Sequence, residues 1–191
     1  MNFLKYRTMT SNLFAQVASA LASTDFKLDD ADVKAIHDAL VNQELVDEAL
    51  SYYGLKEIPG PQSSPTISSW IKKWSAAAKV KTSVNDDQTA WCSIFVNEIA
   101  QRCGCETTNK INARSWLDVG DEIPLEDAKT GDVIILWRVK RDGWQGHVGF
   151  FIRKGPNVCW ILGGNQSNQV NILPFGDGYV LGIRRLRKVH A

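Results

Sequence analysis

The sequence contains few of the residues from which metal sites and charged binding surfaces are built. It has only three histidines in 191 residues, and the spacing of its four cysteines matches no zinc pattern. We therefore expect no metal and no cofactor. The formal net charge is +1, so the chain as a whole has no attraction to nucleic acid, and we expect no nucleic-acid partner. The basic run at residues 184–188 is the exception, and such runs most often belong to solvated tails or strand ends.

Long apolar segments are also missing. No apolar stretch reaches the roughly 18–20 residues that a membrane span requires, so we expect none. The first 23 residues carry an early basic pair and a mildly apolar run, as a secretory signal does, but polar residues interrupt that run. We interpret the segment as an amphipathic helix and expect synthesis in the cytoplasm without an export signal. Reduced thiols are the default expectation, because a chain of this length does not need disulfides to fold.

Hydrophobic periodicity divides the chain into a helical part followed by a β part. The pattern predicts helices over 12–22, 30–53 with a break near Asn42, 67–78, and from Cys92 to about Gly104. Five short runs rich in β-branched and aromatic residues follow, at 131–139, 147–154, 158–165, 169–175 and 179–187. Helices first and strands afterwards indicate an α+β fold, with the helices packed on an antiparallel sheet of about five strands. We expect a helical N-terminal extension over 1–42 and one domain over 43–191.

One cysteine stands where a helix can make it reactive. Cys92 lies in the stretch "TAWCSIFVNE", directly before an apolar run with helical spacing. A helix N-terminus and a nearby imidazole both lower the pKa of a thiol. His37 lies within a predicted helix and His190 is the penultimate residue, whereas His147 opens a predicted strand. The pattern therefore favours Cys92 and His147 as a catalytic thiol and base, although a buried, inert cysteine and a structural histidine stay open on pattern alone.

A histidine base usually needs a third group to orient its ring. If strands 147–154 and 158–165 form an antiparallel hairpin, the residue opposite His147 is near 165. This register places Asn165 or its neighbour beside His147. A slip of one residue would turn the opposite face of the strand toward the histidine.

Several phrases of the sequence resemble a known family. The phrases are "YYGLKEIPG", "WCSIFVNEIAQRCG", "ARSWLDVG", "GDVIILWR", "GHVGFF" and "LGGNQSNQVNI", and together they cover about residues 45–187. In this order they resemble papain-like cysteine hydrolases of the bacterial and phage branch related to NlpC and CHAP domains. The resemblance implies a papain-like fold over 43–191, with Cys92 as nucleophile, His147 as general base and Asn165 as the orienting residue. Gln166 is the alternative for the third role.

The resemblance also implies a substrate, and the chemistry of other residues suggests further members of the site. The substrate would be an amide bond of peptidoglycan, within the stem peptide or between sugar and peptide. The backbone N–H of Cys92 would stabilise the oxyanion, with Gln88 as a weaker second donor. Trp91 and Trp144 are candidates for the substrate groove, although most tryptophans belong to the core. Arg114 could bind a substrate carboxylate, against a structural role at the surface.

The sequence thus favours a cell-wall cysteine amidohydrolase that acts at the bacterial wall as a phage endolysin or a delivered antibacterial toxin. Two alternatives stay open. One is a non-catalytic wall-binding or virion module on the same fold, and the other is a papain-like hydrolase or transferase that acts on proteins. Residues 1–42 would cap the catalytic domain, bind substrate, or dock an immunity protein or delivery machinery.

Overall fold

The computed structural model describes residues 30–59, 62–80 and 89–189. The chain divides into two compact units, residues 1–40 and residues 41–191. The described residues of the first unit, 30–40, are helical. The helix predicted over 12–22 lies outside the described residues. Within the described ranges, no helix is long and apolar enough to cross a membrane.

Among the residues that the structure describes, three α-helices precede the sheet. They are α2 (Asp30–Leu50), α3 (Pro65–Ala77) and α4 (Cys92–Arg102). The predicted break near Asn42 is wrong, because α2 runs through this residue and the Asn42 side chain donates from Nδ2 to Asp132 Oδ1 at 2.9 Å. Proline at the first position of α3 fits a helix start, since the missing N–H has no partner there. Gly104, with φ of +63°, follows the end of α4.

The second unit is built on an antiparallel sheet of six strands. In spatial order β1-β6-β2-β3-β4-β5, all its pairs are antiparallel. The strands in chain order are β1 (Asp121–Ile123), β2 (Val133–Trp137), β3 (Gly146–Gly155), β4 (Val158–Gln166), β5 (Gln169–Gly176) and β6 (Val180–Arg185). The five predicted strands are all present, and the additional strand β1 has only three residues, too few for a recognisable pattern. The predicted α+β class is confirmed.

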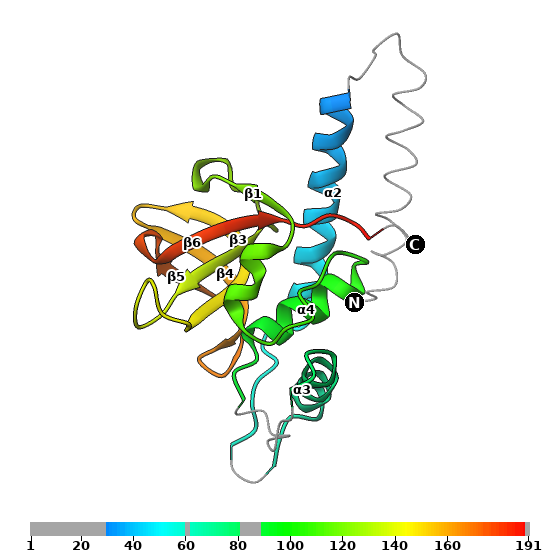
Figure 1. Cartoon of the computed structure of the whole chain (residues 1–191), viewed down its shortest axis with the longest axis vertical. Helices are drawn as coiled ribbons and strands as arrows, with labels where there is room; N and C mark the ends of the chain where they lie inside the picture. Colours follow the sequence, from blue (N-terminus) through cyan, green and yellow to red (C-terminus); the bar gives the residue numbers. More distant parts are fainter. Residues whose placement is uncertain (1–29, 60–61, 81–88, 190–191) are drawn as a thin grey trace. The chain divides into compact units, whose positions relative to one another are not determined.

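The sheet buries apolar side chains on both faces, as the two-residue period of strands allows. On one face, Phe150 of β3 lies edge-on to Phe95 of α4, with ring centroids 6.4 Å apart. The opposite face carries a second cluster, which includes Phe151 and Ile161, with Phe175 packed against it. Figure 1 shows α4 against the strands, and this packing fixes the first turn of α4 beside β3 and β4.

The basic run at 184–188 is neutralised within the fold rather than presented as a free tail. Its four cations pair, in chain order, with Glu122, Asp132, Glu106 and Glu44. These pairs join the end of β6 and the residues after it to β1, to the turn before β2, to the segment after α4 and to the second half of α2. They argue against a role of this run in binding a polyanion.

Candidate active site

Cys92 is the first residue of α4, so the predicted helix start at the thiol is confirmed. Its side chain is buried, and the backbone groups of Cys92, Ser93 and Val148 lie beside the sulfur. Val148 follows His147 directly in β3, so the thiol lies against the start of the strand that carries the histidine. Burial raises the pKa of the Cys92 thiol, while these backbone groups and the positive charge of Arg138 act in the opposite direction.

The first turn of α4 approaches β4 so closely that only glycine fits between them. A Cβ atom at Gly164 would lie 2.4 Å from the ring of Trp91 and 2.7 Å from Cβ of Phe95. Trp91 is fully buried, and its Nε1 donates to Oε1 of Glu57 at 2.8 Å. The prediction that Trp91 lines a substrate groove is therefore wrong, because the ring is core. Glu57, within the "YYGLKEIPG" phrase, was not recognised from the sequence as a residue that fixes the helix start.

His147 on β3 and Gln166 on β4 lie together, on the side of β4 that Gly163 faces, whereas Gly164 faces Trp91 and Phe95. His147 and Gln166 are both buried, and Nε2 of His147 lies 2.9 Å from Oε1 of Gln166. The predicted hairpin register is confirmed, since Phe150 pairs with Leu162. However, the register with β5 shifts between Gly163 and Gln166, and Asn165 has a φ of +56°.

This β-bulge brings Gln166, the alternative for the third role, to His147 in place of Asn165. A bulge adds one residue to a strand and so reverses which side chains face which side after it. In a regular strand Asn165 would lie opposite His147. With the bulge, Gln166 occupies that place.

The orientation of the Gln166 amide is fixed by its other hydrogen bonds. Nε2 of Gln166 donates to the carbonyl of Ile161 at 3.2 Å, and to the carbonyl and Oδ1 of Asn171 at 2.7 and 2.9 Å. Nδ2 of Asn171 donates in return to the Gln166 carbonyl at 3.0 Å. Oε1 therefore faces the imidazole, and because a carbonyl oxygen only accepts, Nε2 of His147 must carry the hydrogen. Nδ1 is left with its lone pair and is the nitrogen that can act as a base.

The imidazole is held neutral. Burial lowers the pKa of His147 to about 4, the hydrogen bond that Nε2 donates to Gln166 opposes this shift, and the positive charge of Arg138 adds to it. At neutral pH the resting site therefore contains a neutral thiol and a neutral imidazole.

The pKa of His147 makes the stability of the protein depend on pH. Between about pH 6.5 and 4 the unfolded chain binds a proton at this histidine while the folded protein does not, so the free energy of unfolding falls as the pH falls. We expect a loss of about 3 kcal/mol from this group across that window, and none of it above the window. Urea denaturation of the wild type and of His147→Gln at several pH values measures it. His37→Gln is the control, and an identical pH slope in His147→Gln would contradict the expectation.

The remaining predicted site residues are more scattered. The Arg114 guanidinium donates to the carbonyls of Lys140, Arg141 and Gln145, at 2.9 to 3.0 Å. These bonds hold the β2–β3 loop and favour a structural role, so binding of a substrate carboxylate stays a prediction. Trp144, on the same loop, is 78% exposed and is available for a groove. Gln88 lies outside the described residues.

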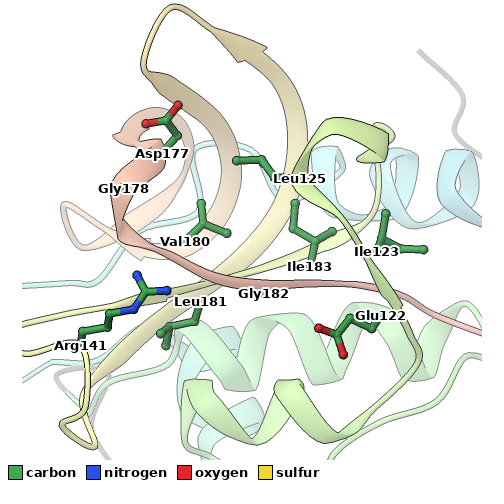
Figure 2. A pocket seen from close by; sticks show the side chains of 10 residues that line it. All are labelled: Glu122, Ile123, Leu125, Arg141, Asp177, Gly178, Val180, Leu181, Gly182 and Ile183. Carbon is green, nitrogen blue, oxygen red and sulfur yellow. The ribbon is translucent and has the colours of Figure 1, made fainter.

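Two surface hollows lie on other parts of the sheet. One, of about 380 Å³, is lined along β6, with Arg141 and Glu122 at opposite ends (Figure 2). The other, of about 600 Å³, follows residues 123–129 and Arg185. Neither is lined by Cys92, His147 or Gln166, so the candidate active site is not one of these hollows. In the described ranges, no group of three or more His, Cys, Asp or Glu side chains could hold a metal ion.

The sheet, the helix that packs on it and the thiol at that helix's start define a papain-like α+β fold of the NlpC/P60 type. The structure of the resuscitation-promoting-factor-interacting protein RipA has this fold. RipA aligns at a TM-score of 0.51 and 16% identity over 81% of this chain and 65% of its own. A second RipA structure aligns at a TM-score of 0.50 over 80% of this chain and 65% of its own. The two RipA proteins are variants mutated at a histidine and at a cysteine.

Two further structures are similar at lower scores. The peptidoglycan hydrolase RipB of Mycobacterium tuberculosis aligns at a TM-score of 0.47 and 15% identity over 96% of this chain and 83% of its own. A lipoprotein-like NLP/P60 protein of Staphylococcus aureus aligns at a TM-score of 0.44 and 19% identity. This last alignment covers 88% of the chain but spans only 45% of the staphylococcal protein. No protein-family model and no curated protein matches the sequence.

Proposed function

We propose that the chain is a peptidoglycan hydrolase that cleaves an amide bond of the cell-wall peptide with Cys92, His147 and Gln166. The observation that carries the chemistry is the buried pair of His147 on β3 and Gln166 on β4, which fixes one tautomer of the histidine. Val148, the residue after His147, has its backbone beside the Cys92 sulfur. The substrate class rests on the ordered sequence phrases, which resemble cell-wall hydrolases. The NlpC/P60-type fold agrees with it.

The reaction begins with transfer of the thiol proton from Cys92 to Nδ1 of His147. The thiolate attacks the amide carbon, and the carbonyl oxygen becomes the oxyanion of a tetrahedral intermediate. In this proposal the backbone N–H of Cys92, the first residue of α4, donates to the oxyanion. When the intermediate collapses, the C–N bond breaks, the imidazolium gives its proton to the departing amine, and an acyl-thioester on Cys92 remains.

Hydrolysis of the thioester uses the same groups in reverse. His147 Nδ1 takes a proton from water, and the resulting hydroxide equivalent attacks the thioester carbon. The C–S bond breaks, the carboxylic acid product leaves, and the proton returns to the Cys92 sulfur. Gln166 accepts a hydrogen bond from Nε2 throughout, so the ring keeps the orientation that presents Nδ1.

The non-catalytic alternative is less well supported. A binding module does not need a buried histidine fixed by a glutamine whose own amide has three acceptors. A hydrolase or transferase that acts on proteins would keep the same groups, and only the substrate separates it from our proposal.

The proposal is tested by mass spectrometry of purified peptidoglycan after incubation with the wild type and with Cys92→Ala. We expect new fragments from the wild type alone, and their masses identify the amide bond. Reaction of Cys92 with a thiol-alkylating probe near neutral pH is measured alongside. No fragments and an unreactive Cys92 would refute the proposal, while no fragments with a reactive Cys92 would favour a protein substrate.

The biological setting is a further part of the proposal. A wall hydrolase of this kind acts at the bacterial cell wall, as a phage endolysin or a delivered antibacterial toxin. We assign docking of an immunity protein or delivery machinery to residues 1–42. Deletion of these residues would then abolish delivery or neutralisation while the purified protein still releases the same peptidoglycan fragments.

A further inference from the structure

The imidazole of His147 has an aromatic neighbour from the far end of the sheet. The ring of Phe175 is stacked on it, with ring centroids 5.2 Å apart and ring planes at 28°. Phe175 belongs to β5 and pairs with Cys159, whereas Gln166 lies at the opposite end of β4. The sheet must therefore be strongly curved for these side chains to meet. Phe175 packs against the apolar cluster that contains Phe151 and Ile161.

We infer that Phe175 is a positioning residue that holds the plane of the His147 ring for the proposed hydrolysis. The hydrogen bond to Gln166 holds one ring atom, Nε2, but constrains the ring plane only weakly against small rotations about the Cβ–Cγ bond. A stacked ring removes those rotations, because the two planes then stay close to parallel. The two constraints together determine where Nδ1 points.

Phe175 also covers one face of the imidazole with apolar surface. A protonated ring is stabilised by water, so an apolar cover disfavours the imidazolium. The positive charge of Arg138 also disfavours the proton on His147. Removal of the Phe175 ring should therefore loosen the orientation of the His147 imidazole and expose it to water, which makes it easier to protonate.

The experiment compares Phe175→Ala and Phe175→Leu with the wild type. The control is Phe151→Leu, which alters the same apolar cluster from a buried position on β3. The titration of His147 is followed by NMR of the ¹⁵N-labelled imidazole, and kcat and KM are measured on peptidoglycan fragments. In Phe175→Ala we expect the pKa of His147 to rise from about 4 toward its ordinary value. We also expect kcat to fall about tenfold to a hundredfold, with a smaller change in KM, because the base is misplaced.

Phe175→Leu separates the two effects and guards against a variant that does not fold. Leucine keeps apolar cover without a flat ring, so the pKa of His147 should stay low while kcat falls. Phe151→Leu should lose stability without moving either quantity. An unchanged titration and an unchanged kcat in both Phe175 variants would overturn the inference and leave Phe175 as core. The NMR titration needs no substrate, so failure of the wild type to cleave peptidoglycan would refute the proposed function without deciding this point.

Discussion

Replacing Gln166 with glutamate is expected to lower kcat by about 10²- to 10⁴-fold, the range lost when a catalytic histidine loses its correct orientation or tautomer. The result is not obvious, because a carboxylate accepts a hydrogen bond from an imidazole better than an amide does. The loss of kcat is expected because of the amide nitrogen of Gln166, which a glutamate lacks. The amide nitrogen of Gln166 faces three oxygens, from Ile161 and Asn171, and all three are acceptors.

A carboxylate oxygen in that place would face the same three acceptors with nothing to donate. Buried acceptors without a donor cost about 1–3 kcal/mol each, so the glutamate side chain should leave the position opposite His147. The measurement is kcat on peptidoglycan fragments, with thermal unfolding and the ¹⁵N tautomer of His147 recorded on the same samples. Gln169→Glu is the matched control, since it adds the same charge on the adjacent strand, where the side chain is less buried.

A Gln166→Glu variant with undiminished kcat would contradict this expectation. If Gln166→Glu keeps or raises kcat, then only the acceptor toward His147 matters, and the hydrogen bonds of the amide nitrogen are a structural detail of the bulge. The assignment of Nδ1 as the base would then lose its support from this network. Gln166→Ala separates the two cases further, because it removes the acceptor without placing an oxygen against Ile161 and Asn171.

Most helices and strands were predictable because each one shows in the spacing of apolar residues along a short stretch of the chain. The helix that starts at Cys92 follows from an apolar period that begins there, and the hairpin of β3 and β4 follows from two β-rich runs around a short turn. Both are determined by neighbours in the chain. The strand β1 has no such signal, because three residues cannot show a period and its pairing is with distant β6.

The site was predictable only in part, for the same reason. Cys92 and His147 lie at element starts, which the sequence marks, but the choice between Asn165 and Gln166 depends on a bulge that one residue creates. Two glycines and an asparagine, "GGN", were the available signal, since such residues tolerate the backbone of a bulge. Strand pairing and sheet curvature bring Asn171 and Phe175 to Gln166 and His147. Neither pairing nor curvature can be predicted from the spacing of neighbouring residues.

The largest effect on stability is expected from Asp132, in the turn "TGD" that precedes β2. Its carboxylate is fully buried and accepts hydrogen bonds from Arg185, from Nδ2 of Asn42 and from the backbone N–H of Lys129. Asp132→Ala removes the carboxylate partner of the buried Arg185 guanidinium. We expect a loss of about 3–5 kcal/mol in the free energy of unfolding, measured by urea denaturation at neutral pH.

The double variant Asp132→Ala/Arg185→Met tests whether the buried Arg185 charge, left without its carboxylate partner, causes the loss of stability. If it does, this variant should be more stable than Asp132→Ala alone, which is a coupling that independent sites do not show. Glu122→Ala is the control, because Glu122 is exposed and its pair with Arg184, at 3.4 Å, should contribute about 1 kcal/mol or less. A loss in Asp132→Ala no greater than that of the control would mean that the carboxylate is not needed to join the second half of α2 to the sheet. The folded fraction of Asp132→Ala should keep its kcat, because Asp132 precedes the first residue of β2, whereas His147 pairs with Leu136 near its end.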